Sequence, residues 1–200
     1  MIKNVIFDVG KVLVEWDPVG AMQELGFDEK TACAVAAATT DTSDWNENDR
    51  GALSDEEILA KLIANAPVYE KEIRLFWQNV GKAISQYAYA KDWIRSLKRN
   101  GYGVYILSNY ARWTYANTTE ALSFVNDVDG AVFSYEVKQI KPEPEIYQTL
   151  LAKYDLKAEE CVFLDDRQEN IEAAKAQGME GIVFTGYENA VQALRGYGVE

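Results

Sequence analysis

Six polar residues that could take part in chemistry follow, or lie close to, short apolar runs of the chain. They are Asp8, Ser108, Asn109, Lys141, Asp165 and Asp166. A carboxylate at a strand end can act as a nucleophile or hold a metal ion, and hydroxyl, N–H and ammonium groups can bind phosphate. Because ligands bind beyond the carboxyl ends of the strands in an open parallel sheet, we expect these residues to meet in one crevice.

The carboxylates also have simpler interpretations when each is taken alone. Asp8 could close a turn at the strand end or cap a helix, and Asp165 and Asp166 could form an acidic N-cap for a helix near residues 168–177. Neighbouring carboxylates repel each other unless a cation or protons offset them. Mg²⁺ prefers hard oxygen ligands and keeps phosphate and water in its shell, so it is the metal that this pair favours.

The remaining three residues also have simpler interpretations when each is taken alone. Ser108 and Asn109 precede a helical pattern near residues 111–122 and could bind phosphate or simply form a turn. Lys141 precedes a proline, which favours an extended backbone, and its ammonium could balance phosphate and Asp8 or lie solvated on the surface. The joint order of nucleophile, phosphate binder, cation and metal carboxylates indicates function more strongly than any single residue.

The elements that must position these residues alternate between strand and helix patterns. Apolar runs predict strands at residues 2–7, 104–107, 131–133, 162–164 and 181–184, and helical faces lie at 90–98, 146–151 and 171–176. Such alternation is typical of a mostly parallel sheet between two helical layers, that is, a Rossmann-like three-layer α/β sandwich. We assign residues 1–16 and 87–200 to this core domain.

Residues 17–86 show no strand pattern and are predicted to form an inserted helical cap domain. Helical patterns lie at 32–38, 56–64 and 75–83, and Ser54 with Glu57 forms a capping box for the second of these. An all-helical insert at the mouth of a parallel sheet can cover the site and select the substrate. Trp16, Trp45, Trp77 and Arg50 lie in or beside it and could contact a sugar or an anion, although packing of the cap core is the simpler interpretation of the tryptophans.

Composition excludes several classes of function. The chain has 200 residues and a net charge of −12, which disfavours nucleic acid and anionic membranes as partners. It contains no histidine, so Ser–His and Cys–His mechanisms and His-ligated zinc are excluded. The two cysteines are expected to be free thiols, and no signal peptide or apolar run of membrane-spanning length is evident, so we expect a cytoplasmic protein.

Four segments resemble the four motifs of haloacid dehalogenase-like hydrolases. In motif order they are Phe7–Leu13, Leu107–Asn109, Lys141–Pro142 with Glu145–Tyr147, and Phe163–Asp166 with Asn170. The resemblance spans about residues 2–184. The first motif reads Asp-x-Gly, which resembles the subgroup of the bacterial α-D-glucose-1-phosphate phosphatase, and residues 48–54 of the insert also resemble that subgroup.

The resemblance implies a magnesium-dependent phosphatase acting on a small phosphorylated metabolite such as glucose 1-phosphate. Asp8 would attack phosphorus to form an aspartyl-phosphate, which water then hydrolyses. Mg²⁺ would be held by Asp8, the Gly10 carbonyl and Asp166, with Asp165 as a direct or water-mediated ligand. Lys141 and Ser108 would hold the phosphate oxygens with Asn109 beside them. We expect a monomer or a homodimer.

Gly10 departs from the family pattern, because most phosphatases of the superfamily carry a second Asp at this position as general acid and base. The leaving group could need little help, as in an anomeric sugar phosphate; another carboxylate could substitute, with Glu15 and Asp17 nearest in sequence; or the enzyme could be slow. Gly10 also keeps open a metal-independent 2-haloacid dehalogenase and a non-catalytic regulatory protein. The acidic pair Asp165 and Asp166 argues against the dehalogenase.

Overall fold

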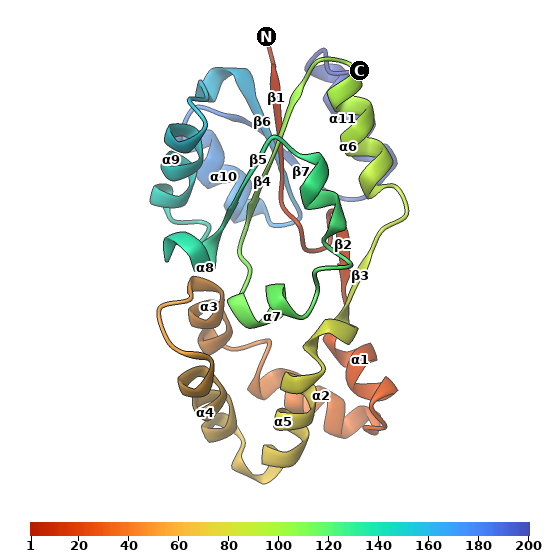
Figure 1. The fold of residues 1–200 in the computed structure, drawn as a ribbon, viewed down its shortest axis with the longest axis vertical. Coiled ribbons are helices and arrows are strands. Elements are labelled where there is room, and N and C mark those ends of the chain that lie inside the picture. Colours follow the sequence, from red (N-terminus) through yellow and green to blue (C-terminus); the bar gives the residue numbers. More distant parts are fainter.

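The computed structural model describes all 200 residues, which fold into a sheet-containing core lobe and a helical cap lobe (Figure 1). The core sheet is entirely parallel, with strand order β5-β4-β1-β6-β7. Its strands are β1 (Asn4–Phe7), β4 (Gly103–Ser108), β5 (Gly130–Phe133), β6 (Cys161–Asp165) and β7 (Glu180–Val183). The predicted α/β fold class is therefore confirmed.

Helices cover both faces of this sheet. On one side lie α6 (Ala90–Arg99) and α11 (Tyr187–Gly196), and on the other α9 (Pro144–Lys153) and α10 (Gln168–Ala176) (Figure 1). Side chains of a strand alternate between faces, so Val5 and Phe7 of β1 enter the apolar cluster that contains α6, whereas Ile6 enters the cluster that contains α9. The sheet thus lies between two separate apolar layers.

The cap lobe has an apolar core of its own, built by five helices. These are α1 (Pro18–Glu24), α2 (Glu29–Ala38), α3 (Ser43–Arg50), α4 (Asp55–Asn65) and α5 (Glu70–Gln78). Ser54 and Glu57 form the predicted capping box at the start of α4. The helices α1 and α3 were not predicted, because both are short and only Trp45 and Asn48 are buried in the polar α3.

Two local predictions at the borders of the cap are wrong. Residues Ile84–Gln86 form a strand, β3, which pairs antiparallel with β2 (Val14–Trp16), and three residues are too few to give a readable strand period. The helical pattern at 75–83 divides into the end of α5 and a separate 3₁₀ turn at Val80–Ala83. The chain consequently enters and leaves the cap lobe through one paired set of strands.

The segment after β4 is also less regular than predicted. Instead of a helix at 111–122, the chain forms α7 (Arg112–Ala116), and a 3₁₀ turn follows at Ser123–Asp127. The short helix α8 (Ser134–Val137) follows β5. Cys33 and Cys161 are free thiols, as predicted, and no helix has the length and apolarity required to cross a bilayer.

Candidate active site

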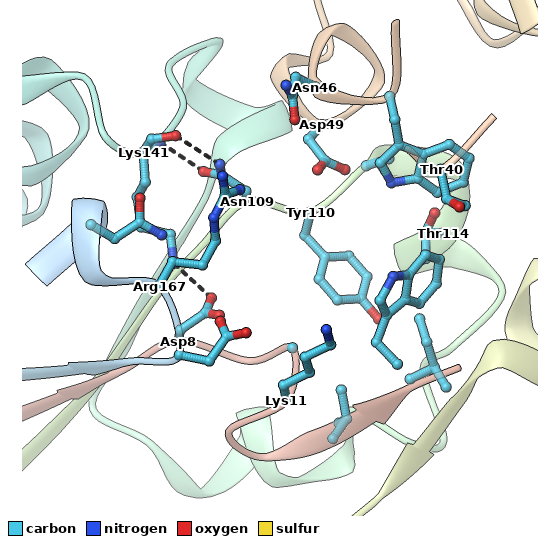
Figure 2. A pocket seen from close by; sticks show the side chains of 18 residues that line it. Asp8, Lys11, Thr40, Asn46, Asp49, Asn109, Tyr110, Thr114, Lys141 and Arg167 are labelled. Atoms are coloured by element: carbon cyan, nitrogen blue, oxygen red, sulfur yellow. Dashed lines mark hydrogen bonds and ion pairs between the residues drawn. The ribbon is translucent and has the colours of Figure 1, made fainter. Parts of the chain in front are cut away.

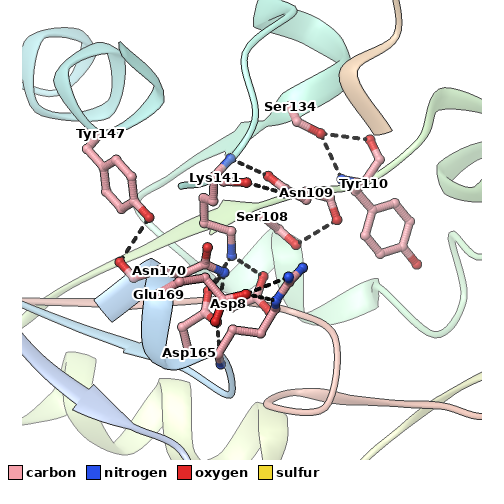
Figure 3. Close-up of polar contacts among 11 residues, drawn as sticks. Asp8, Ser108, Asn109, Tyr110, Ser134, Lys141, Tyr147, Asp165, Glu169 and Asn170 are labelled. Atoms are coloured by element: carbon pink, nitrogen blue, oxygen red, sulfur yellow. Dashed lines mark hydrogen bonds and ion pairs between the residues drawn. The ribbon is translucent and has the colours of Figure 1, made fainter. Parts of the chain in front are cut away.

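The ends of three adjacent strands bring the predicted residues together. Asp8 follows β1, Ser108 is the last residue of β4, and Asp165 is the last residue of β6. Because β1 lies between β4 and β6 in a parallel sheet, these three ends point to the same edge (Figure 3). Asp8, which could have been a simple turn residue, lies at the centre of this edge.

Lys141 joins two carboxylates at the bottom of the site. Its Nζ lies 2.7 Å from Oδ1 of Asp8 and 2.6 Å from Oδ2 of Asp165, and the side chain is only 2% exposed. The ammonium also lies 5.2 Å from the centroid of the Phe163 ring. The alternative of a solvated surface lysine is therefore wrong, because three charges are removed from water together and each depends on the others for compensation.

Burial and charge shift the pKa values of these groups. Burial raises the pKa of Asp8 to about 6, while the nearby Lys141 ammonium opposes the shift. Burial acts to lower the pKa of Lys141, but the carboxylates of Asp165 and Asp8 outweigh this effect and raise it. The ammonium therefore keeps its proton, and Asp8 is ionised at and above neutral pH.

Both carboxylate oxygens of Asp165 are bound by neighbouring groups. Besides Lys141, it accepts hydrogen bonds from Nδ2 of Asn170 at 3.0 and 2.9 Å and from the backbone N–H of Arg167 at 2.8 Å. Asp166 is half-buried, and its pKa is raised by burial and then by the charge of Asp165. In this arrangement Asp165 orients Lys141, and Asp166 is the member of the pair that faces the cavity.

The residues present fit a divalent cation. Asp8, Asp165 and Asp166 each offer a carboxylate oxygen, and these oxygens lie within 4.8 Å of one another. The Gly10 carbonyl oxygen accepts no backbone hydrogen bond, and Gly10 lines the same cavity. The buried Oδ1 of Asn170 has no hydrogen-bond partner, and the water shell of a hydrated cation would supply one. An all-oxygen donor set of this kind suits Mg²⁺.

Ser108 and Asn109 are placed beside the ionic groups rather than in open contact with solvent. Ser108 is buried, its hydroxyl donates to the Asn109 carbonyl at 3.4 Å, and its proximity to Asp8 lowers the pKa of that carboxyl. Asn109 donates from Nδ2 to the Lys141 carbonyl at 3.0 Å and accepts at Oδ1 from the Lys141 N–H at 2.8 Å. This reciprocal pair fixes the backbone that carries the ammonium (Figure 3).

A cavity of about 410 Å³ opens above these groups, between the two lobes (Figure 2). Asp8, Lys141 and Asp166 line its core side, and Trp16 and Trp45 line its cap side. The two indole rings lie 5.8 Å apart and also pack in the cap core. Both interpretations of these tryptophans therefore hold: they pack the cap and form a cavity wall.

Several other candidates from the sequence do not face the cavity. The guanidinium of Arg50 is bound by both carboxylate oxygens of Glu143, at 2.8 and 2.6 Å. Trp77 stacks on Trp113 with ring centroids 6.0 Å apart, behind the cavity wall. The two carboxylates proposed as substitute acids already bind other groups of the protein. Glu15 accepts a hydrogen bond from the Tyr87 hydroxyl at 2.8 Å, and Asp17 caps the N-terminus of α1.

One residue of the cavity was not singled out from the sequence. Asp49 of α3 projects into the cavity from the cap side, opposite Asp8 (Figure 2). Its only signal was its position inside residues 48–54, which resemble the glucose-1-phosphate phosphatase subgroup. Local patterning could not distinguish Asp49 from the other acidic residues of this polar helix.

Comparison with known proteins agrees with the motifs. The haloacid dehalogenase-like hydrolase family matches residues 2–178, which is most of the chain. The chain belongs to this family. It is 26% identical to the sesquiterpene phosphatase astK of Aspergillus oryzae, over 92% of this chain and 90% of that protein. It is 28% identical to a D-ribitol-5-phosphate phosphatase of Bacteroides thetaiotaomicron, over 90% of each chain.

Solved structures of the haloacid dehalogenase-like family share the fold. A family enzyme from Bacteroides thetaiotaomicron, crystallised with magnesium and inorganic phosphate, superposes with a TM-score of 0.70. The match covers 91% of this chain and 93% of that one, at 22% sequence identity. The prediction of a haloacid dehalogenase-like hydrolase with a Rossmann-like sheet is thus confirmed.

Proposed function

We propose that the protein is a magnesium-dependent phosphatase of small phosphorylated metabolites, with Asp8 as the nucleophile. The observation that carries the proposal is the convergence of Asp8, Lys141 and the pair Asp165 and Asp166 on one point at the strand ends. Phosphoryl transfer requires positioning and charge neutralisation more than elaborate covalent chemistry, and this site supplies both.

In the proposed reaction, the Asp8 carboxylate attacks phosphorus and the ester oxygen leaves, which gives an aspartyl-phosphate that water then hydrolyses. Lys141 binds the phosphate oxygens and neutralises their charge, Asp165 and Asn109 hold Lys141 in place, and Ser108 orients Asp8. Mg²⁺, held by Asp8, Asp166 and the Gly10 carbonyl with Asp165 behind them, would supply further neutralisation of the phosphate charge.

The cavity supports a small substrate with a carbon skeleton that can lie against Trp16 and Trp45. A sugar phosphate such as glucose 1-phosphate meets this description, because pyranose faces stack on indole rings. The related phosphatases are named for a pentitol phosphate and a sesquiterpene, so both are named for small organic substrates. We further propose a cytoplasmic monomer or homodimer, and the charge of −12 supports the absence of nucleic-acid and membrane partners.

Hydrolysis of p-nitrophenyl phosphate with and without Mg²⁺ tests the proposal. We expect turnover that requires Mg²⁺ and stops on addition of EDTA, and a loss of about 10⁴-fold or more in Asp8→Asn, which keeps the side-chain shape but removes the nucleophile. Glu56→Gln is a matched control, because Glu56 is an exposed cap carboxylate outside the cavity.

Two outcomes would support the alternatives instead. Chloride release from 2-chloropropionate that is insensitive to EDTA would favour a dehalogenase. A folded protein that turns over neither 2-chloropropionate nor any member of a panel of sugar 1-phosphates, sugar 6-phosphates and p-nitrophenyl phosphate would favour a non-catalytic role.

A further inference from the structure

The proposed reaction leaves one proton without an evident carrier. An alkoxide is a poor leaving group, and a general acid that protonates it is typically worth about 10²–10⁴-fold in rate. The position two residues after Asp8 is Gly10, which has no side chain to do this. A Cβ built on Gly10 would have no atom within 4 Å, so the space beside Asp8 on this side is open.

Apart from the three carboxylates that could hold a metal ion, Asp8, Asp165 and Asp166, only one carboxyl group reaches the cavity. The acidic residues of the cavity wall are Asp8, Asp49 and Asp166. Asp8 and Asp166 belong to the acidic group that fits a cation. Asp49 comes from the opposite wall and makes no ion pair, so its carboxyl group is available to an atom bound in the cavity.

The core lobe holds the backbone of Asp49 in place. The hydroxyl of Ser134, at the start of α8, donates a hydrogen bond to the Asp49 carbonyl. Two residues further on, Gly51 ends α3 in a left-handed conformation, with φ of 69°, directly against Tyr135, where a Cβ would come within 2.9 Å of the Tyr135 backbone. These contacts fix the distance between this cap residue and the strand ends.

We infer that Asp49 is the catalytic proton donor and acceptor of the proposed phosphatase reaction, supplied by the cap in place of a residue at position 10. When the bond between phosphorus and the ester oxygen breaks, its electron pair stays on that oxygen, which takes the proton of the Asp49 carboxyl group and leaves as an alcohol. Asp49 is then a carboxylate.

The same group returns to its starting state in the second step. Water attacks the phosphorus of the aspartyl-phosphate, its spare proton passes to the Asp49 carboxylate, and the electron pair of the breaking bond returns to Asp8. Hydrogen phosphate leaves, and both side chains are restored. The inference rests on the proposed function. It assigns the proton transfer to Asp49 rather than to Glu15 or Asp17, because neither of these two residues lines the cavity.

The surroundings of Asp49 suit this role. Burial and then the negative charge of Asp8 raise its pKa to about 7, against the opposing effects of Lys141, the Ala111 N–H and Arg167. The group can therefore both hold and release a proton near neutral pH. The titratable or charged side chains that share the cavity with it are Asp8, Lys11, Tyr110, Lys141, Asp166 and Arg167.

The test compares two leaving groups in Asp49→Asn, with Mg²⁺ present. Glycerol 2-phosphate releases an alkoxide that needs a proton, whereas p-nitrophenolate leaves without one. We expect the first-turnover rate on glycerol 2-phosphate to fall by about 10²–10⁴-fold and that on p-nitrophenyl phosphate by less than about tenfold. Because the second step also loses its base, p-nitrophenol should appear as a burst followed by slow turnover.

Gly10→Asp provides an independent readout, since the space beside Asp8 is open. It should speed glycerol 2-phosphate hydrolysis more in the Asp49→Asn background than in the wild type, because only there is a proton donor missing. Equal gains in both backgrounds would overturn the inference. Glu56→Gln should leave both substrates unaffected.

Other outcomes are equally decisive. Equal losses on both substrates, accompanied by a higher KM, would assign Asp49 to substrate binding, and no loss would remove it from the reaction. Asp49→Ala should reproduce the leaving-group pattern of Asp49→Asn if the pattern reflects the lost proton. A wild-type protein inactive on both substrates would overturn the proposed function itself, whereas an active wild type with an unselective Asp49→Asn would overturn only this inference.

Discussion

The core lobe and the cap lobe differ in how their charged groups are held. On the core wall, Lys141, Asp8 and Asp165 are buried and connected to each other within 2.7 Å. In the cap lobe, charged groups form pairs near the surface and away from the cavity, such as Lys61 with Asp44, and the cap side of the cavity presents Trp16, Trp45 and the carboxyl group of Asp49. The three buried charges that hold one another in place thus belong to the core lobe, whereas the helical insert contributes indole surface and the single carboxyl group of Asp49.

The largest effect is expected on removing the central cation of the core wall. Lys141→Met keeps a long side chain but leaves the carboxylates of Asp8 and Asp165 buried without compensation. We expect the free energy of unfolding to fall by about 3–5 kcal/mol, measured by urea denaturation at pH 7. Lys61→Met removes the cation of a cap pair that is half-exposed, and should cost less than about 1 kcal/mol. Similar losses in both variants would contradict the difference between the two lobes.

A smaller effect, of opposite sign, is expected at Asp49. Since its pKa is raised from 3.8 to about 7 in the folded protein, its contribution to stability is present at low pH and lost as the pH rises through 7. Asp49→Asn removes the cost of the buried charge, so relative to the wild type it should stabilise the protein at pH 8 by on the order of 1 kcal/mol.

Thermal denaturation at two pH values measures this effect. At pH 8 the Tm of Asp49→Asn should exceed that of the wild type by about 2–4 °C, and at pH 4, close to the unperturbed pKa of 3.8, most of the advantage should disappear. Glu56→Gln should show no such pH dependence. An equal difference at both pH values would mean that the Asp49 carboxyl is not desolvated.

The smallest effect is expected at the bridge between the lobes. Arg50 of α3 donates both hydrogen bonds to Glu143, which lies just before α9, and both side chains are partly exposed. Arg50→Gln should lower the free energy of unfolding by about 0.5–1 kcal/mol, and the loss should shrink in high salt. A loss as large as that of Lys141→Met would show that the cap carries a structural charge comparable to that of the core.

The core wall was predictable because parallel strands end at one edge. Asp8, Ser108 and Asp165 each follow an apolar run, and that rule alone places them together. The details within the site were not predictable. Asn109 bonds the backbone of Lys141 across 32 residues of sequence, a contact that only the folded chain creates.

The cap wall was less predictable for a related reason. An inserted helical lobe has no shared strand edge to align its residues, so no local rule selects Asp49 from the polar sequence of α3. The burial of Lys141 also required tertiary information, since a lone lysine before a proline usually points into solvent. Sequence therefore locates the site through the sheet and leaves the opposite wall to the structure.

The antiparallel pair β2–β3 connects the insert to the core at one place, because the strands that lead into and out of the insert are neighbours. A segment joined in this way can lengthen, shorten or be exchanged while β1 and β4 keep their positions in the sheet. Evolutionary change in substrate preference is then expected to accumulate between residues 17 and 83. The buried charges of Asp8, Lys141 and Asp165 beneath this segment are expected to stay unchanged.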